Sequence, residues 1–203
     1  MRIGLVRKSV VRRSALVCAL ALLAVLGLDG RAAELPDGCP SALSRAETRY
    51  GLPTGLLMAM AQVESGRLDP ATGRVVPWPW TIQAGGRSYF YASASEAIRG
   101  AKAILKTGNG FVDVGCLQVD LYHHPDAFQT LDAAFNPATN VDYAARYLLS
   151  LARERGSWLE AVAAYNAGDP AAGMDYLDKV LYRWKGVRVT ASAPRRPASR
   201  PIP

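Results

Sequence analysis

The chain has 203 residues, half of them hydrophobic, which is enough apolar surface for one domain with a sizeable core. Its formal net charge of +7 is concentrated at the two ends, because residues 1–33 hold six Lys/Arg and one acid, and four arginines follow from Arg188 onward. The segment between them is close to neutral and has no basic stripe, which argues against nucleic-acid binding.

The N-terminal segment is predicted to be a secretory signal peptide over residues 1–33. A basic, acid-free stretch through Arg12–Arg13 precedes an uninterrupted apolar run from Ser14 to Leu28, and the small residues of the GRAA sequence at 30–33 suit cleavage. The apolar run is shorter than the roughly 20 residues of a membrane-spanning helix, so an uncleaved anchor is the weaker alternative. We therefore expect an exported, periplasmic protein.

Two helices are predicted next. The first covers Pro40–Tyr50 and is stopped by Gly51, and the second starts at Pro53 and ends at Gly66. The second helix is apolar over Leu56–Val63 and then carries a glutamate.

That glutamate, Glu64, is the most informative residue of the chain. At helical spacing it shares a face with Leu57, Met60 and Ala61, so its carboxyl points where the apolar side chains point. Burial there would raise its pKa and keep it protonated near neutral pH, as a general acid requires. The alternative is a helix-end glutamate that leans out to solvent, and the helix alone does not decide between the two.

The rest of the chain predicts one small β-hairpin and further helices. Val75–Gln83 and Ser88–Tyr91 flank a turn at Ala84–Arg87. Helices are predicted over Glu96–Lys106, Pro137–Arg155, Trp158–Ala167 and Asp169–Trp184, with Gly110–Asp120 irregular. The fold class is therefore mainly α, with one domain over residues 34–187 and a disordered Pro/Arg-rich tail over residues 188–203.

Two cysteines, Cys39 and Cys116, remain after signal cleavage. An even count in an oxidising compartment favours a disulfide, worth about 2–4 kcal/mol, over two buried free thiols. No His/Cys cluster has the spacing of a metal site, because His123 and His124 are adjacent and are expected at the surface near a turn. We expect no metal and no cofactor.

Three short segments carry the functional prediction: QVESG at 62–66, VGCLQV at 114–119 and AAYNAG at 163–168. In this order and at these separations they resemble the Glu-Ser, Gly-Leu-Met-Gln and Ala-Tyr-Asn-Ala-Gly motifs of the soluble lytic transglycosylases, lysozyme-like enzymes that cut peptidoglycan. The resemblance covers roughly Cys39 to Trp184 and implies an α+β, lysozyme-like fold. It departs at Cys116-Leu117, which stands in place of Leu-Met, while Gln118 is retained.

The resemblance implies cleavage of the β-1,4 bond between N-acetylmuramic acid and N-acetylglucosamine. Glu64 would protonate the leaving oxygen and then act as base toward the sugar's own C6 hydroxyl, giving a 1,6-anhydro end without adding water. One carboxylate then suffices. Asp113 and Asp120 flank the middle motif and are the candidate bases of a hydrolytic muramidase of the same fold, or else solvated loop residues. A catalytically silent peptidoglycan-binding module is the third interpretation.

The resemblance also implies roles for polar residues around Glu64. The Tyr165 hydroxyl would hold the Glu64 carboxyl, and an ordinary core tyrosine is the alternative. Gln118 offers a donor and an acceptor to a sugar. Ser65 and Asn166 are expected to bind substrate as well, and helix capping is the alternative for each.

Aromatic residues of the predicted hairpin would supply faces on which sugars stack. Trp78 and Trp80, in the segment at 77–81, are the first candidates. Tyr89, Phe90 and Tyr91 are further candidates, and packing within the hairpin is the alternative for all of them. The expected partner is the peptidoglycan glycan strand, bound by a monomer. The sequence leaves open whether the protein serves general wall turnover, a secretion apparatus or a flagellum.

Overall fold

The computed structural model describes residues 38–108, 111–166 and 169–191 of the chain. The predicted signal peptide and the residues from 192 onward lie outside the described residues. Among the helices of the described part, none is long and apolar enough to cross a membrane.

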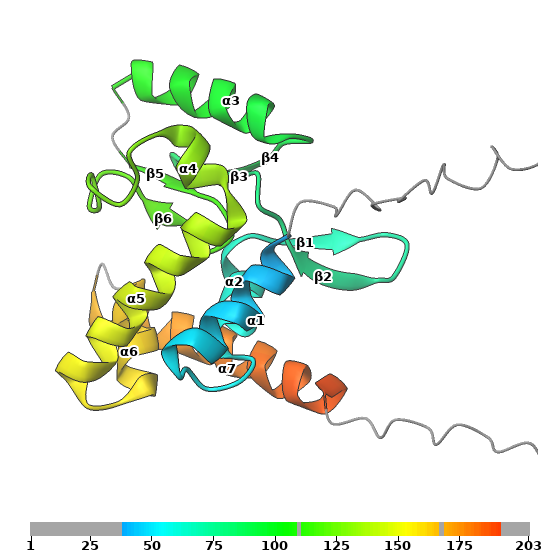
Figure 1. Cartoon of the computed structure of the whole chain (residues 1–203), viewed down its shortest axis with the longest axis vertical. Coiled ribbons are helices and arrows are strands. Elements are labelled where there is room, and N and C mark those ends of the chain that lie inside the picture. The colour runs from blue at the N-terminus through cyan, green and yellow to red at the C-terminus, as the bar shows by residue number, and fades with distance from the viewer. Residues whose placement is uncertain (1–37, 109–110, 167–168, 192–203) are drawn as a thin grey trace, which may run out of the picture. The chain divides into compact units, whose positions relative to one another are not determined.

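Helices make up most of the described residues, which confirms the mainly α fold class. They are α1 (Cys39–Tyr50), α2 (Leu56–Glu64), α3 (Ala94–Lys106), α4 (Leu131–Phe135), α5 (Pro137–Arg155), α6 (Trp158–Tyr165) and α7 (Pro170–Ala191) (Figure 1). The last helix continues four residues into the stretch predicted as a tail, and the five-residue α4 was not predicted.

Two antiparallel sheets accompany the helices. One pairs β1 (Gly66–Asp69) with β2 (Arg74–Pro77), and the other has the order β4-β3-β5-β6, with β3 (Thr81–Ala84), β4 (Arg87–Phe90), β5 (Val112–Val114) and β6 (Val119–Asp120).

Between residues 66 and 90 the chain thus forms two hairpins, β1–β2 and β3–β4, where the sequence predicts one. Val75 and Val76 belong to β2 and pair with β1, which precedes them in the chain. Of the residues 75–83 predicted as one strand, only those in β3 pair with β4. Prolines at 77 and 79 explain the break, because a proline has no N–H to donate to a strand ladder, so residues 75–83 do not run on as one strand. The segment Gly110–Asp120, predicted irregular, contains the short strands β5 and β6.

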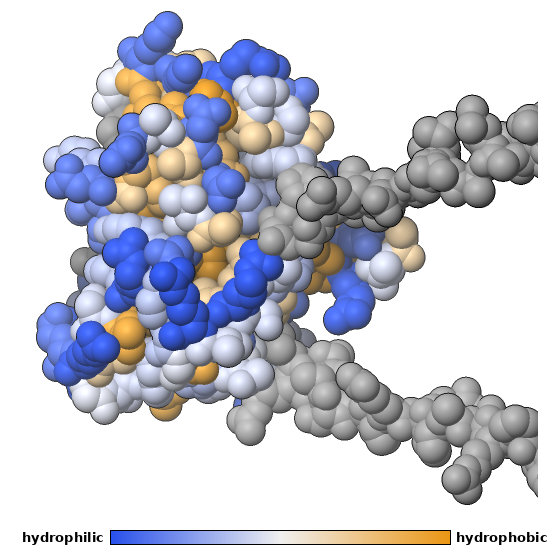
Figure 2. Space-filling view, in the orientation of Figure 1, coloured by the Kyte–Doolittle hydropathy of each residue, from blue (hydrophilic) through white to orange (hydrophobic). Residues whose placement is uncertain are grey.

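The main core lies between the helices. Helix α2 packs on α1 and α7, α1 on α5, and α6 on both α5 and α7. Leu57, Met60 and Ala61 of α2 are completely buried, so the helix face that carries Glu64 points into this core, as the helical spacing predicts. Where α1 meets solvent it carries polar residues, and Figure 2 shows a hydrophilic surface over this helix.

A second, smaller core joins the four-stranded sheet to two helices. Helices α3 and α4 cover the sheet around Ile82, Val112, Val114 and Phe135, all of them buried. The sheet with its helices holds the middle motif in place beside the end of α2.

The buried Glu47 of α1 caps α2. Its Oε2 accepts a hydrogen bond from the Gly55 N–H at 2.8 Å, and its Oε1 accepts one from the Leu57 N–H at 2.8 Å. Gly55, the residue that precedes α2, has no side chain to do this, so a carboxylate from another helix satisfies the free N–H groups.

Replacing Glu47 with Ala is expected to lower the free energy of unfolding by about 2–4 kcal/mol, because two buried N–H groups lose their acceptor. Urea denaturation followed by circular dichroism measures this change. The matched control is Glu154→Ala on α5, where the side chain is 66% exposed and only a small change is expected. Equal stabilities of the two variants would contradict the capping role.

Candidate active site

The QVESG segment bends sharply where α2 ends. Strand β1 begins at Gly66, directly after Glu64 and Ser65. A Cβ atom at position 66 would overlap the Gln62 carbonyl oxygen and the Val75 side chain, so only glycine fits there. This turn fixes Glu64 on the last turn of α2, with the β1–β2 hairpin beside it.

Glu64 has an unusual environment for a carboxyl group. Its Oε1 is buried and has no hydrogen-bond partner among the described residues. Burial raises the pKa of Glu64 to about 8; the Tyr176 hydroxyl and the Asn166 side chain favour the ionised form, while the negative charge of Asp113 opposes it. The carboxyl therefore keeps its proton at neutral pH, which is the direction that the sequence predicts.

Asp113 on β5 is the second carboxylate of the site. Burial and the charge of Asp120 raise the pKa of Asp113 to about 6, and the proximity of His123 lowers it. No hydrogen bond to its carboxylate is found within the described residues. Near pH 7 Glu64 is thus mostly protonated and Asp113 mostly ionised. These are the protonation states that a general acid and a charge-stabilising carboxylate need.

The middle motif is held by one buried amide. Asn140 of α5 donates from Nδ2 to the Val114 carbonyl at 2.9 Å, and its Oδ1 accepts from the Leu117 N–H at 3.1 Å. Gly115 has φ +84°, and a Cβ atom there would overlap the Asn140 amide. The glycine of the motif is therefore required by close packing and by backbone conformation.

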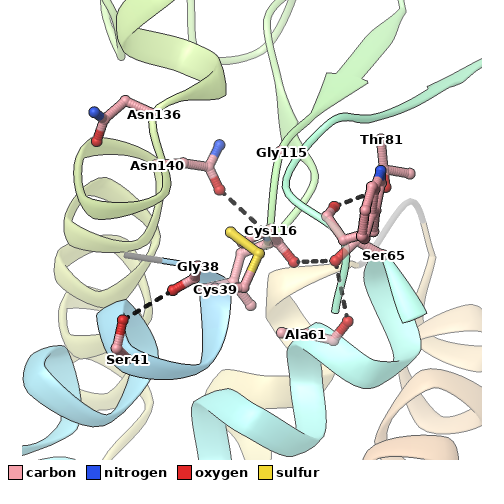
Figure 3. The surroundings of a disulfide bond; sticks show 12 residues. Gly38, Cys39, Ser41, Ala61, Ser65, Thr81, Gly115, Cys116, Asn136 and Asn140 are labelled. Carbon is pink, nitrogen blue, oxygen red and sulfur yellow. Dashed lines mark hydrogen bonds between the residues drawn. A yellow bond between two sulfur atoms is a disulfide. The ribbon is translucent and has the colours of Figure 1, made fainter. Parts of the chain in front are cut away.

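Ser65 and the disulfide tie the middle motif to the helices (Figure 3). The Ser65 hydroxyl is completely buried and lies 2.7 Å from the Cys116 carbonyl oxygen, with the Ala61 carbonyl at 3.3 Å. A disulfide joins Cys116 to Cys39 at the start of α1, which is the pairing that the sequence predicts. Ser65 thus positions the backbone next to Glu64, and its hydroxyl is already hydrogen-bonded within the protein.

Gln118 has both backbone strain and an unpaired atom. Its φ of 44° lies in the left-handed region that non-glycine residues seldom adopt. Its Nε2 donates to the Gly115 carbonyl at 2.7 Å and to the Thr81 carbonyl at 3.2 Å, while its buried Oε1 has no partner among the described residues. The side chain is fixed in one orientation and keeps one acceptor free.

Two tyrosines surround the Glu64 carboxyl. Tyr165 donates its hydroxyl to the Leu117 carbonyl at 2.9 Å, and burial together with the nearby Glu64 raises its pKa well above the ordinary value. Tyr176 of α7 is the phenol that acts on the pKa of Glu64, although its hydroxyl and Glu64 Oε1 do not reach hydrogen-bond geometry. In the structure the Tyr165 hydroxyl therefore binds the backbone of the middle motif close to Glu64, and Tyr176 is the tyrosine that favours the ionised form of the Glu64 carboxyl.

Sequence reasoning missed Tyr176. Its helical spacing with Leu177 and Val180, both buried, indicates that this part of α7 faces the core. That pattern predicts burial, but it carries no information about which residue of another helix the hydroxyl meets. Asn166, which was expected at the site, follows α6 and also lowers the pKa of Glu64.

A histidine–tyrosine group continues from Tyr165 along α5. The Tyr147 ring lies 5.6 Å from that of Tyr165 and 4.7 Å from that of His124. His124 Nδ1 and the Tyr143 hydroxyl share a hydrogen bond of 2.9 Å, and burial lowers the pKa of His124. His124 was expected at the surface, but the tyrosines one turn apart on α5 partly bury it.

The tryptophans of the insertion pack on each other and on an arginine. The rings of Trp78 and Trp80 meet edge to face with centroids 5.4 Å apart, and the Arg67 guanidinium lies 5.0 Å from the Trp78 ring centroid. Trp78 donates its indole N–H to the Tyr91 carbonyl at 2.7 Å. Trp78 also lines a surface pocket of about 270 Å³ with Arg67 and Leu68. Its ring is therefore packed within the protein on one part and accessible to a ligand on another.

Two further features lie apart from this site. A surface cavity of about 490 Å³ between α1 and α5 contains none of the predicted site residues. Among the residues that the structure describes, no group of three or more His, Cys, Asp or Glu side chains is placed to hold a metal ion.

Replacing Tyr176 with Phe is expected to raise the pKa of Glu64 further, because the phenol favours the ionised carboxyl. An activity that needs protonated Glu64 falls as pH rises through that pKa, so its alkaline limb should move to higher pH in the variant. A pH–rate profile of the purified protein measures the shift. Tyr182→Phe, at an exposed position of α7, is the control, and an unmoved limb in Tyr176→Phe would exclude the interaction.

Comparison with known proteins gives one finding. A model of the family described as "Transglycosylase SLT domain" matches residues 41–176, a range that includes all three motifs and ends at Tyr176. No curated protein and no solved structure matches the chain.

Proposed function

The chain belongs to the transglycosylase SLT domain family, and from this premise we propose that it cleaves the N-acetylmuramic acid–β-1,4–N-acetylglucosamine bond of peptidoglycan without adding water. The observation that carries the proposal is the half-buried Glu64 carboxyl, whose raised pKa of about 8 makes it a proton donor at neutral pH. The products would be glycan strands with 1,6-anhydro-N-acetylmuramic acid ends.

The first step is proton transfer from Glu64. Its proton passes to the glycosidic oxygen, the bond from that oxygen to C1 of the muramic acid breaks, and positive charge develops at C1. Glu64 is then an ionised carboxylate with little access to water. The Tyr176 hydroxyl and the Asn166 amide favour this ionised form, so they support the residue at the moment when it is charged.

The second step closes the ring. The C6 hydroxyl oxygen of the same sugar attacks C1, and its proton returns to the Glu64 carboxylate, so the enzyme is regenerated and no water is consumed. A raised pKa helps this step as well, because a poorly solvated carboxylate is a stronger base. One residue therefore serves as acid and then as base.

Substrate positioning falls to Gln118 and to the tryptophans. The free Oε1 of Gln118 would accept an N–H or O–H from the sugar, and its side chain, anchored by two hydrogen bonds, needs no rearrangement to do so. Trp78 would offer its indole to the glycan next to Arg67. Ser65 and Tyr165 would act through the backbone of the middle motif, where their hydroxyls bind.

A hydrolytic muramidase is the second candidate, and Asp113 is the observation that favours it. An ionised Asp113 near a protonated Glu64 is the arrangement in which a second carboxylate activates water. In the proposed reaction Asp113 instead acts on Glu64 only through its charge.

Asp113→Asn separates the two candidates. In the proposed mechanism cleavage persists, and loss of the negative charge lowers the pKa of Glu64, so the alkaline limb of the pH–rate profile moves to lower pH. In a muramidase that uses Asp113 as base, the same change would cost about 10²–10⁴-fold in kcat. Cleavage of purified sacculi measured across the pH range gives both readouts.

Product analysis tests the proposal itself. Digestion in H₂¹⁸O followed by mass spectrometry should give anhydro ends that carry no ¹⁸O. One ¹⁸O atom for each cut would establish hydrolysis instead. Sacculi that are bound but never cut would establish the catalytically silent alternative.

The place of action is part of the same proposal. The basic and apolar N-terminal residues favour export to the periplasm, where peptidoglycan is accessible. General wall turnover, a secretion apparatus and a flagellum each need local cleavage of the wall, and a pull-down from the periplasm would distinguish these settings.

A further inference from the structure

Three aromatic rings gather on the surface next to Asp113. Phe111 and Tyr122 are 56% and 58% exposed, and the His123 side chain is 62% exposed. Their ring centroids lie 4.8 Å apart for Phe111–Tyr122, 5.6 Å for Phe111–His123 and 5.2 Å for Tyr122–His123. We call these three residues the aromatic trio. Exposed apolar rings in mutual contact are a feature of ligand-binding surfaces.

Strand pairing brings the trio together. Phe111 directly precedes β5, and Tyr122 and His123 follow β6 after Leu121; β6 pairs antiparallel with β5 through Asp113↔Asp120. Continuing this register by one pleat sets Phe111 opposite Tyr122. The trio therefore lies at the open end of the β5–β6 hairpin.

One carboxylate fixes two members of the trio. Asp120 Oδ1 accepts the Tyr122 backbone N–H at 2.7 Å, and Oδ2 lies 2.6 Å from His123 Nδ1. Asp120, a candidate base in the sequence, is thus occupied by hydrogen bonds that hold the rings. A surface held in this way loses little conformational entropy when it binds a ligand.

The trio lies on the same side of the hairpin as Asp113. Side chains two apart on a strand point to one face, so Phe111 shares a face with Asp113, and Tyr122 with Asp120. His123 is close enough to Asp113 to lower its pKa, and Asp113 is close enough to Glu64 to raise the pKa of Glu64. The rings therefore lie on the hairpin face that carries Asp113, the carboxylate whose charge acts on Glu64.

The charge around the trio selects its ligand. Asp113 and Asp120 lie on the strands that carry the trio, and their negative charges repel phosphates and the carboxylates of stem peptides. N-acetylglucosamine, every second sugar of the strand, is neutral with or without stem peptides, and its C–H face packs on aromatic rings while its hydroxyl groups stay in water.

We propose that Phe111, Tyr122 and His123 form a sugar-binding surface that contacts the glycan strand beyond the bond cut at Glu64. This proposal rests on the proposed function, since it takes the same strand as ligand. The sugars stack on the trio, and Asp120 is a positioning residue that keeps the rings in place.

The test is a kinetic comparison on glycan strands whose stem peptides have been removed with an amidase. Phe111→Ala/Tyr122→Ala should raise KM about tenfold, as expected for the loss of one or two stacking faces, and leave kcat within about twofold. Phe111→Tyr/Tyr122→Phe, which keeps both rings, should restore the wild-type KM. Tyr182→Ala is the control, because this α7 tyrosine is 75% exposed and lies outside the site.

Each contrary outcome overturns the proposal. An unchanged KM, or a lower kcat at unchanged KM, would show that the trio binds no sugar. A rise in KM confined to peptide-bearing strands would assign the surface to the stem peptide. If the wild-type products contain ¹⁸O from water, the proposed function fails while the KM comparison still decides the role of the trio.

The same comparison is available without turnover. In a Glu64→Gln background, the dissociation constant of the peptide-free strands should rise about tenfold when both rings are removed. Equal dissociation constants with and without the rings would contradict the proposal, as would the absence of any binding of these strands.

Discussion

Replacing Glu64 with Gln is expected to abolish cleavage of purified sacculi while leaving binding to them intact. Glutamine has nearly the same size and shape as glutamate and can still form hydrogen bonds, but its amide cannot act as a general acid at neutral pH. The loss expected for removing a general acid is about 10²–10⁴-fold in kcat, and in the proposed mechanism the same residue is also the base, which favours the upper end. Release of soluble muropeptides measures cleavage, and co-sedimentation with sacculi measures binding.

Glu154→Gln is the matched control for this substitution. Glu154 lies on α5 with its side chain 66% exposed, so the same chemical change there should leave both cleavage and binding unaltered. Cleavage by Glu64→Gln at a rate close to that of the wild type would contradict the proposed mechanism. Loss of binding together with cleavage would show that the variant has lost its structure rather than its proton.

Removing the disulfide is expected to have the second largest effect. The bond between Cys39 and Cys116 closes a loop with a sequence separation of 77, so the double substitution to Ser should lower the free energy of unfolding by about 4 kcal/mol. The effect should reach the active site as well. The Cys116 carbonyl accepts the Ser65 hydroxyl, so looser packing at Cys116 disturbs the residue that follows Glu64.

Urea denaturation with and without a reducing agent measures this contribution. The reductant should lower the unfolding midpoint of the wild-type protein and leave that of Cys39→Ser/Cys116→Ser unchanged, which makes the variant its own control. Equal midpoints for the oxidised wild type and the double variant would contradict the structural role of the bond.

The secondary structure was predictable from the sequence wherever a segment itself contains the residues that start and stop it. Helix α5 has a proline at its start and Gly156 at its end, and its bounds agree with those expected from the sequence. Strands β5 and β6 have three and two residues, too few for a periodic pattern, and they form because β3 pairs with β5 from a distance of about 30 positions. A short strand of this kind depends on its partner, which the local sequence does not identify.

The site was predictable to the extent that motifs mark it. Glu64 stands out because it interrupts an apolar helix face, and the structure buries that face. The contribution of Tyr176 to the pKa of Glu64 and the hydrogen bonds of Asn140 to the middle motif both depend on contacts between elements that are far apart in the sequence. Such contacts cannot be inferred from composition and spacing, so the roles of these two residues could be identified only in the structure.

The most direct test of the account is a pH titration of the Glu64 side-chain carboxyl by ¹³C NMR, with the Glu64→Gln spectrum used to assign the signal. A buried carboxyl that serves as general acid should titrate with a pKa of about 8. A midpoint near 4.5, the ordinary value for glutamate, would mean that Glu64 is ionised at neutral pH and would contradict the mechanism.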